Sequence, residues 1–473
     1  MGFGDIRRTF SQIAACLEVG SRCGRGPVSG GGRVGGREIT GRPTSLPTAV
    51  VRKYRGYVSN DAFSSATADL PADMGGHAAA EFEPLVRTFA RLVGNRRGAG
   101  GALSVHRHGR VLAEVWTGEA APGVAWTRDT GSIVFSATKG IAATVVHRLA
   151  DRGLIDYDLP VAAYWPEFGA AGKDRITVRQ LLTHRAGLSG LAPIAAGLDE
   201  VLDHRLMEQR LAAAKPDRLL GVPAYHALTF GWLLSGLARS VTGRGMGELI
   251  RSEVAEPLGI DGMYLGRPPA DTAMSVAALS GSRLAAAGSV IGAMFLGRAS
   301  GIPGAPGAAT RALFLPGLEA LLEGDEPPIL NTELAAGNGV CTSSALATMY
   351  GALACGGTAN GRQYLSANTI RSLRKVQTLH LDHALFYLPM LWHLGYHSLP
   401  APGAPAGFGH IGLGGSFGWA DPRSGLSIGF VHNRLTLNKF AWDQIAASWI
   451  LPLAVRNARP TTGPAHLPQP QAA

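Results

Sequence analysis

The chain reads Phe135-Ser136-Ala137-Thr138-Lys139-Gly140 where a predicted helix begins, and this stretch is the sharpest chemical feature of the sequence. A serine hydroxyl is a poor nucleophile until a base removes its proton. A lysine three residues later lies one helical turn along on the same face, where its amine can reach that hydroxyl. The spacing therefore predicts a nucleophile, Ser136, and its base, Lys139.

The predicted helix offers the conditions that such a lysine needs. It runs to Arg152, Gly153 ends it, and its apolar positions recur at helical spacing as Ile141, Val145, Val146 and Leu149. Burial and the positive potential of a helix N-terminus both lower the pKa of a lysine, and the neutral amine is the base. The same N-terminus favours the oxyanion formed in acyl transfer.

Lysine is rare in this chain, since only six of the 44 Lys and Arg residues are lysine. Arginine stays protonated in proteins, whereas a desolvated lysine can lose its proton. A lysine at this spacing therefore indicates that its titration matters, with coincidence as the alternative. The spacing recurs at Ser372 and Lys375, but Arg371 and Arg374 flank it with little apolar cover, so we expect a surface helix there.

A second serine pattern is Gly414-Gly415-Ser416-Phe417-Gly418. It satisfies the nucleophile-elbow motif, which joins a strand to a helix and is followed by an acid and a histidine. Here strand-like sequence follows Ser416, and only 57 residues remain, with Asp421 and His432 too close to suit that topology. We therefore expect a glycine-rich strand.

Two other segments support chemistry at Ser136. Tyr225, in Ala224-Tyr225-His226-Ala227, places a phenol at a predicted helix start, where a nearby cationic lysine would let it titrate and shuttle protons. Gly409-His410-Ile411-Gly412-Leu413-Gly414-Gly415 would let a ligand approach a strand closely and offers N–H groups to an oxyanion. The alternatives are a half-buried core tyrosine and a strand packed against a helix.

Strand patterns lie near both ends of the chain, and the middle is helical. Glu83-Pro84 opens a helix that Gly94 closes, and a hairpin follows over residues 103–115. A second hairpin spans residues 417–430, and a last amphipathic helix carries Trp442, Ile445 and Trp449. This order predicts an α+β fold, with one antiparallel sheet completed by both ends of the chain and a helical part beside it.

The chain has 473 residues and a formal charge of +10, and the charge is unevenly distributed. Residues 1–56 carry ten basic and three acidic groups, so the remainder is only +3. A nucleic-acid partner would depend on this leading segment alone, and we therefore expect none. The sequence contains no run of eighteen apolar residues, so it predicts no membrane span.

Targeting signals are weak. Arg7-Arg8-Thr9-Phe10 is a fragment of a twin-arginine pattern, and Ile13-Ala14-Ala15-Cys16 loosely resembles a lipoprotein cleavage site, with too few apolar residues between them. The four cysteines, Cys16, Cys23, Cys341 and Cys355, show neither metal-ligand spacing nor the density of a disulfide framework. We expect a cytoplasmic or cell-associated protein without metal or cofactor.

Taken in order, these motifs resemble the serine β-lactamase, or penicillin-recognising enzyme, family, and within it the class C-like β-lactamase-related esterases and lipases. The resemblance extends over residues 78–453. It is carried by Phe135–Gly140, by Leu181-Leu182-Thr183-His184-Arg185-Ala186-Gly187-Leu188, by Gly409–Gly412 and by Asp421-Pro422.

The resemblance implies a β-lactamase/transpeptidase-like fold, in which an antiparallel sheet flanked by helices adjoins a mostly helical domain, with the site between them. Ser136 would be the nucleophile, Lys139 its base, and Tyr225 part of the proton relay. His410-Ile411-Gly412 stands where the family has Lys-Thr-Gly. The N–H groups of Leu413 and Ser136 would then form the oxyanion hole.

Three departures bear on the substrate. Ala227 replaces an asparagine of the family, and His410 and Ile411 replace a lysine and a threonine. The changes remove an amide, a hydroxyl and a fixed cation suited to a carboxylate, since histidine is largely neutral at pH 7. They favour neutral, apolar esters over β-lactams or peptidoglycan. The Ala- and Leu-rich region 268–328 is either the wall of an acyl pocket or a structural insertion.

The favoured function is a carboxylesterase or lipase that cleaves a small-molecule or lipid ester through an acyl-enzyme on Ser136. The alternatives are a β-lactamase or D-Ala-D-Ala carboxypeptidase, and a catalytically silent scaffold. We expect a flexible basic extension over residues 1–77, the hydrolase domain over 78–458 and a disordered tail over 459–473. Within the domain, the sheet part would comprise residues 78–135 and 386–458, and the helical part 136–385.

Overall fold

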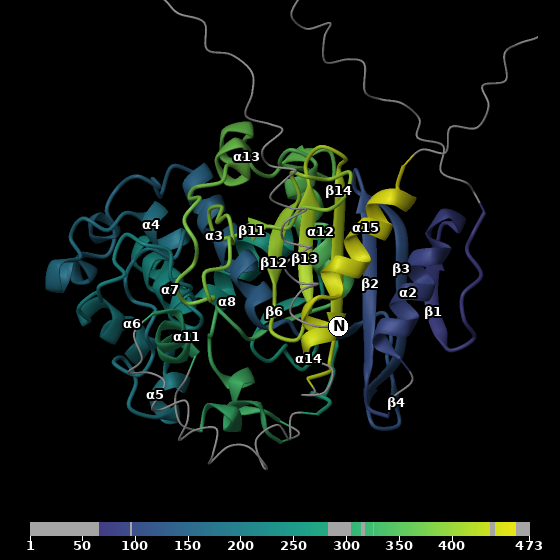
Figure 1. The fold of residues 1–473 in the computed structure, drawn as a ribbon, viewed down its shortest axis with the longest axis horizontal. Coiled ribbons are helices and arrows are strands. Elements are labelled where there is room, and N and C mark those ends of the chain that lie inside the picture. The colour runs from purple at the N-terminus through teal and green to yellow at the C-terminus, as the bar shows by residue number, and fades with distance from the viewer. Residues whose placement is uncertain are drawn as a thin grey trace, which may run out of the picture. The chain divides into compact units, whose positions relative to one another are not determined.

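The computed structural model describes residues 66–94, 97–281, 304–313, 317–324, 326–435 and 440–459, and Figure 1 shows their ribbon. All of them belong to one packing unit, Asp61–Ala473. Most of the predicted basic extension and of the predicted tail lies outside the described residues, as do Cys16, Cys23 and the leader-like patterns. The region 268–328 is described only in part.

The main sheet joins strands from both ends of the chain, as the sequence predicts (Figure 1). Its order is β1-β3-β2-β14-β13-β12-β11, all antiparallel, and β4 pairs with the far end of β3. The pairing of β2 with β14, in which Val105 faces Ile428, unites the two predicted hairpins. The strands are β1 Met74–Ala78, β2 Gly100–Arg107, β3 Arg110–Ala121, β4 Val124–Ala125, β11 His397–Ser398, β12 Phe408–Ile411, β13 Phe417–Asp421 and β14 Leu426–His432.

Helices cover both faces of this sheet. Helices α2 (Glu83–Val93) and α15 (Ala446–Asn457) pack together on one face, over a core that includes Phe89, Phe430 and Ile450. Helix α12 (Ser343–Ala354) packs on the other face against β2, β13 and β14 (Figure 1). Because both faces are covered, every residue of β13 and β14 is buried.

Helix α12 approaches the sheet so closely that two strand positions must be glycine. A Cβ atom on Gly418 would overlap the Tyr350 ring, and one on Gly429 would overlap the carbonyl oxygen of Ser343. Ser104 and Ser427 lie on the same face and bond Ser343 Oγ and the Ala347 carbonyl, at 2.8 Å each. The small side chains therefore set the depth of the helix.

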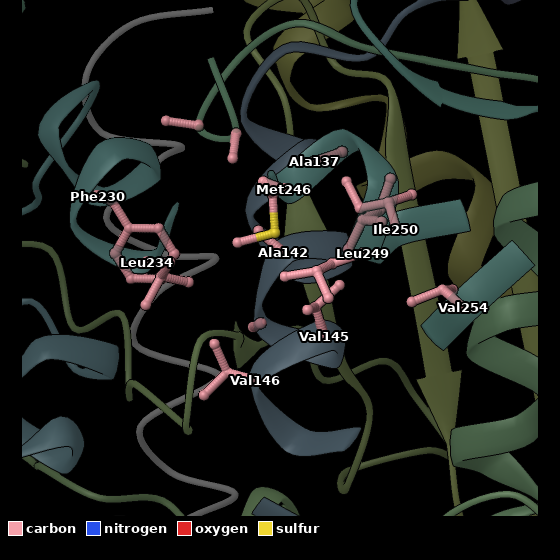
Figure 2. Close-up of a cluster of buried hydrophobic side chains, with 14 of the residues drawn as sticks. Ala137, Ala142, Val145, Val146, Phe230, Leu234, Met246, Leu249, Ile250 and Val254 are labelled. Atoms are coloured by element: carbon pink, nitrogen blue, oxygen red, sulfur yellow. The ribbon is translucent and has the colours of Figure 1, made fainter. Parts of the chain in front are cut away.

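The helical part surrounds α3 (Thr138–Asp151), which begins with one 3₁₀ turn, η3 (Phe135–Ala137). The predicted helix is thus present, and nearly all of its residues are buried. Figure 2 shows Ala142, Val145 and Val146 of α3 between Phe230 and Leu234 of α7 (Thr229–Thr242) and the cluster of Met246, Leu249, Ile250 and Val254.

The remaining described helices and strands complete the fold. The helices are η2 Ala80–Phe82, η4 Val161–Ala163, η5 Pro166–Gly172, α4 Val178–Leu182, α5 Leu198–Leu202, α6 His204–Ala213, α7 Thr229–Thr242, α8 Met246–Leu249, η6 Ile250–Ala255, α9 Glu256–Leu258, α11 Ala305–Leu313, η7 Leu318–Leu322, η8 Pro328–Asn331, α13 Ala367–Arg374 and α14 Phe440–Gln444. The strands are β5 Thr130–Ile133, β6 Met263–Leu265, β7 Ser275–Val276, β8 Gly339–Cys341, β9 Thr358–Ala359 and β10 Arg362–Gln363. No described helix is long and apolar enough to cross a membrane.

The serines of the two other patterns, Ser372 and Ser416, lie on a surface helix and next to a strand, as the sequence predicts. Ser372 belongs to α13, whose Arg371 and Arg374 are exposed. Ser416 is buried immediately before β13, and its Oγ accepts a hydrogen bond from the backbone N–H of His432 at 3.3 Å. The C-terminal helix differs from the expected pattern, because Trp442, Ile445 and Trp449 are exposed. The structure instead buries the face of α15 that carries Ala447, Ile450, Leu451 and Ala454.

We predict that Gly429→Val destabilises the protein by about 1–3 kcal/mol or more, because the side chain must displace α12 from the sheet. Gly197→Ala is the control, since a Cβ atom at Gly197 meets nothing within 4 Å and its φ is −164°. Urea unfolding of the two variants measures the difference. Equal midpoints for Gly429→Val and the unaltered protein would contradict this packing.

Candidate active site

Ser136 lies in the turn that leads from β5 into α3. Phe135 has a φ of 45°, a left-handed conformation that is uncommon for a bulky residue. Two hydrogen bonds hold the turn against β8, from Val134 N to the Gly339 carbonyl at 2.8 Å and from Gly339 N to Thr138 Oγ1 at 2.9 Å. The turn leaves Ser136 half-buried at the N-terminal end of a fourteen-residue helix.

Lys139 is fully buried, and its amine contacts three oxygen atoms. Its Nζ lies 3.1 Å from Ser136 Oγ, 2.7 Å from the Ala227 carbonyl and 2.9 Å from the Ala336 carbonyl. Burial lowers the pKa of Lys139 well below its ordinary value, and no described carboxylate forms an ion pair with it. A neutral amine that donates its two hydrogens to the carbonyls directs its lone pair at Ser136 Oγ.

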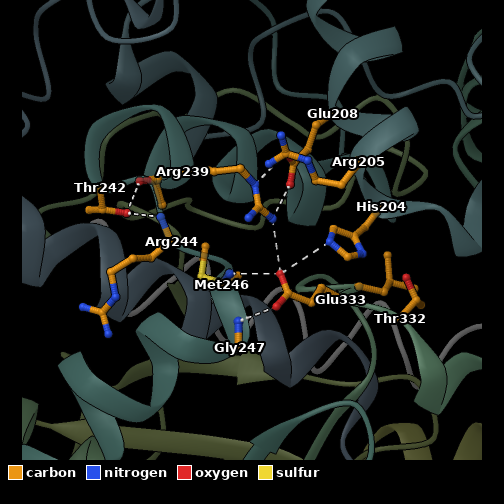
Figure 3. Close-up of polar contacts among 12 residues, drawn as sticks. His204, Arg205, Glu208, Arg239, Thr242, Arg244, Met246, Gly247, Thr332 and Glu333 are labelled. Atoms are coloured by element: carbon orange, nitrogen blue, oxygen red, sulfur yellow. Dashed lines mark hydrogen bonds and ion pairs between the residues drawn. The ribbon is translucent and has the colours of Figure 1, made fainter.

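The Ala336 carbonyl is held in place by two polar side chains of its own segment. Glu333 accepts hydrogen bonds from Met246 N at 3.0 Å and Gly247 N at 3.2 Å and pairs with Arg239, as Figure 3 shows. Asn338 accepts from Leu334 N at 3.2 Å and donates to the carbonyls of Ile329 and Thr332 at 2.7 Å each. These bonds fix the loop that delivers a carbonyl to the lysine.

Tyr225 lies beside both residues. Lys139 Nζ stands 4.8 Å from the centre of its ring, and its side chain is hydrogen-bonded to Ser136. Burial raises the pKa of the Tyr225 phenol, only partly offset by that bond, and the charge of Asp382 adds to the rise. Burial therefore favours the neutral form of both groups in the resting site.

The motif Leu181–Leu188 positions the backbone of Tyr225. The carbonyl of His184 accepts a hydrogen bond from Ala224 N at 3.0 Å, and its Nδ1 accepts from His226 N at 3.2 Å. His226 Nε2 accepts from Leu188 N at 3.1 Å, so its Nδ1 carries the hydrogen and donates to the Ala224 carbonyl at 2.7 Å. The motif thus serves as a template for the tyrosine segment.

Asp382 is a site residue that sequence reasoning missed. It is fully buried, and its Oδ1 accepts from the N–H groups of Tyr225 at 3.1 Å and of Ala384 and Leu385 at 2.9 Å each. Its Oδ2 accepts from Trp392 Nε1 at 3.0 Å, and the Trp392 ring stacks on Tyr225 at a 4° angle. Nothing in the sequence pattern marks this aspartate, 157 residues from its partner.

The Gly412–Gly415 turn joins β12 to β13 and contacts the backbone just before Ser136. A Cβ atom on Gly412 would overlap the carbonyl oxygen of Val134, so only glycine fits there. The N–H groups of Leu413 and Ser136 donate to no acceptor among the described residues. The Leu413 side chain itself is 43% exposed.

His410 lies on β12 but faces inward. It is buried among the rings of Tyr225, Trp392 and His397, and its Nδ1 lies 3.0 Å from the Ile411 carbonyl oxygen. Burial and the neighbouring His397 and Lys139 keep the pKa of His410 well below its ordinary value. The position therefore carries no fixed cation. No group of three or more His, Cys, Asp or Glu side chains within the described ranges is placed to hold a metal ion.

The chain belongs to the Beta-lactamase family, whose model it matches over residues 85–448. It is 49% identical to "Esterase/beta-lactamase LipL" of Mycobacterium tuberculosis (strain ATCC 25618 / H37Rv) over 362 residues, which cover 76% of this chain and 83% of that protein. The family and the fold predicted from the motifs are thereby confirmed.

Solved structures agree with this assignment. A family VIII carboxylesterase is 31% identical, with a TM-score of 0.65 over 80% of this chain and 99% of that one. A penicillin-binding protein homologue from Caulobacter crescentus is 28% identical, with a TM-score of 0.66 over 81% of this chain and 100% of that one.

The depressed pKa of Lys139 predicts a pH-dependent stability. The unfolded chain binds the lysine proton up to pH ~10.4, whereas the folded chain releases it at lower pH. The free energy of unfolding should therefore rise with pH across that interval, by up to about 1.4 kcal/mol per pH unit from this group. Lys139→Met should lose this contribution to the slope.

Urea unfolding over a series of pH values measures both slopes. Lys375→Met, which removes a positive charge from an exposed position, is the matched control. A Lys139→Met variant with the slope of the unaltered protein would show that Lys139 is charged in the folded state.

Proposed function

We propose that this chain is a serine hydrolase that cleaves carboxylic esters through an acyl-enzyme on Ser136. The observation that carries the proposal is the buried Lys139 amine, 3.1 Å from Ser136 Oγ and without a charged partner among the described residues. A 49% identical relative named as an esterase/beta-lactamase and a 31% identical family VIII carboxylesterase support serine carboxylesterase function in this fold.

In the first step Lys139 takes the proton of Ser136 while Oγ attacks the ester carbonyl carbon. The N–H groups of Ser136 and Leu413 donate to the oxyanion of the tetrahedral intermediate. The bond to the alcohol then breaks, the departing oxygen takes the proton, and the acyl group stays on Ser136. Water attacks the acyl-enzyme in the same manner, with Lys139 as base, and releases the acid.

Tyr225 has a relay role in this proposal. Its hydroxyl is hydrogen-bonded to Ser136, and a phenol whose pKa is raised is a hydrogen-bond donor at neutral pH. It donates to the departing alkoxide and recovers its proton from the lysinium. Asp382 holds the backbone of Tyr225 and thereby the direction of the phenol.

The substrate proposed is a neutral ester with an apolar group. The side chain at position 227 is a methyl group, and His410 is buried and neutral, so neither position offers a substrate carboxylate a charge. The loop that carries Asp382 is also apolar at its surface. Its exposed large hydrophobic side chains are Leu379, Leu381, Phe386, Tyr387 and Leu388.

This apolar loop lies beside the tyrosine segment. His383 N donates to the Pro223 carbonyl at 2.9 Å, and Asp382 N and the Leu388 carbonyl close the loop at 3.1 Å. Phe386 and Tyr387 both have positive φ, at 53° and 60°, a backbone conformation that is uncommon for bulky residues. These side chains would contact the apolar part of an ester bound at Ser136.

A β-lactamase or D-Ala-D-Ala carboxypeptidase is the second candidate, because the name of the 49% identical relative includes beta-lactamase. The position of His410 argues against it, since this histidine is no fixed cation for a β-lactam carboxylate. Nitrocefin turnover that exceeds ester turnover would favour this candidate. If a fluorophosphonate probe does not label the protein, it is a catalytically silent scaffold.

We also propose a lipid ester as the natural substrate, a location in the cytoplasm or associated with the cell, and a domain that ends at residue 458. The expected start at residue 78 is too late, because β1 (Met74–Ala78) pairs with β3 in the main sheet. The free thiols of Cys341 and Cys355 support a reducing compartment.

We predict a burst of nitrophenol, equal to one acyl group per chain, when the protein meets a short-chain p-nitrophenyl ester. Ser136→Ala should abolish the burst and lower turnover by at least about 10³-fold. Ser372→Ala, the serine of the second Ser-x-x-Lys pattern, is the matched control and should keep the full burst. Stopped-flow absorbance measures the burst, and the mass of the acylated peptide identifies the acylated residue. Turnover by Ser136→Ala equal to that of the unaltered protein would contradict the proposal.

We also predict that the double variant Leu379→Ser and Phe386→Ser loses activity selectively on long acyl chains. Loss of apolar contact should lower kcat/KM for an octanoyl ester about tenfold, equivalent to ~1.4 kcal/mol, and leave an acetyl ester unchanged. Leu154→Ser, an exposed leucine at the end of α3, is the control. Equal losses on the two esters would mean that the loop does not contact the acyl chain.

A further inference from the structure

We propose that Gln444 is a positioning residue for the oxyanion hole. Its side-chain amide fixes the Gly412–Leu413 peptide and strengthens the Leu413 N–H as a donor. This role rests on the proposed acyl transfer at Ser136, in which that N–H binds the oxyanion.

The Gln444 amide spans the backbone on both sides of Leu413. Its Nε2 donates to the Gly412 carbonyl at 3.2 Å, and its Oε1 accepts from Gly414 N at 3.0 Å. The Gly412 carbonyl and the Leu413 N–H belong to one planar peptide unit and point in opposite directions. A side chain that fixes the carbonyl oxygen therefore fixes the direction of the N–H.

The rest of the turn is bonded around this peptide. Gly412 N donates to the Ser416 carbonyl at 2.7 Å, and Gly415 N donates to the Gly412 carbonyl at 3.0 Å. His432 Nδ1 accepts from Arg434 N at 3.1 Å, so its Nε2 carries the hydrogen and donates to the Gly414 carbonyl at 2.8 Å. Among these backbone donors, only the Leu413 N–H has no acceptor within the described residues.

The two bonds to the Gly412 carbonyl also act on the strength of the donor. A hydrogen bond to the oxygen of an amide polarises the group and makes its N–H a better donor, so that bonds in a chain reinforce one another. Gln444 and Gly415 N both donate to this oxygen. The Leu413 N–H is thereby prepared for an acceptor that becomes negative in the transition state.

Helix α14, which carries Gln444, is itself fixed to the turn. Its Asp443 pairs with Arg434 through both carboxylate oxygens, one of them at 2.8 Å from Nε. Arg434 also donates to the carbonyls of Val93 and Leu92, at 2.6 Å and 2.7 Å. A Cβ atom on Gly415 would overlap the Asp443 carbonyl, so helix and turn are in direct contact.

The test compares Gln444→Leu, which loses both bonds, with Gln444→Glu, which keeps the shape and the acceptor but loses the donor. Both should lower the acylation rate of a p-nitrophenyl ester by about 10- to 100-fold with little change in KM, since the ester's ground-state carbonyl makes weaker use of the N–H. Ile445→Ala, the exposed neighbour of Gln444, is the control and should acylate normally.

A trifluoromethyl ketone, which forms a tetrahedral oxyanion on Ser136, separates positioning from general support of the fold. Its inhibition constant should rise by the same factor as the acylation rate falls, at an unchanged melting temperature. Unchanged inhibition, normal acylation by both variants, or losses that follow the melting temperature would each overturn the role of Gln444. If Ser136→Ala is as active as the unaltered protein, the proposed function fails as well, which is a different result.

Discussion

The rest of the site depends on one buried lysine amine, that of Lys139, which has no charged partner among the described residues. Its two neighbouring carbonyls come from segments 88 and 197 residues along the chain. Burial removes the water that would stabilise the ammonium form, and the carbonyls orient the amine. The fold must therefore bring three distant pieces of chain together around one nitrogen atom.

Each of those pieces has its own support. The largely buried helix α3 carries Lys139, the Leu181–Leu188 motif holds the backbone next to Ala227, and Glu333 and Asn338 fix the loop of Ala336. The sheet supplies the opposite side of the site, because Gly412, directly after β12, contacts the turn before Ser136. The proposed nucleophile, Ser136, and the proposed oxyanion donor, the Leu413 N–H, thus come from different parts of the fold. They are brought together by contact between the two backbone segments.

The sequence allowed prediction of those features whose causes are local or repeated. The Ser136–Lys139 spacing follows from helix geometry, and both hairpins follow from alternation and turn residues. Asp382 and Gln444 were not predictable, because each acts through single contacts made only when distant segments fold together. The exposed Trp442, Ile445 and Trp449 mark a similar limit, since which apolar face of a helix is buried depends on its neighbours.

The contact at Ala227 is made by its main chain and not by its side chain. The amine of Lys139, the proposed base, is oriented by the carbonyl of residue 227, and a main-chain carbonyl is the same whatever side chain stands there. A replacement at this position can therefore change the side chain and still leave the carbonyl that orients the amine. The residue thus separates what its side chain does from what its main chain does.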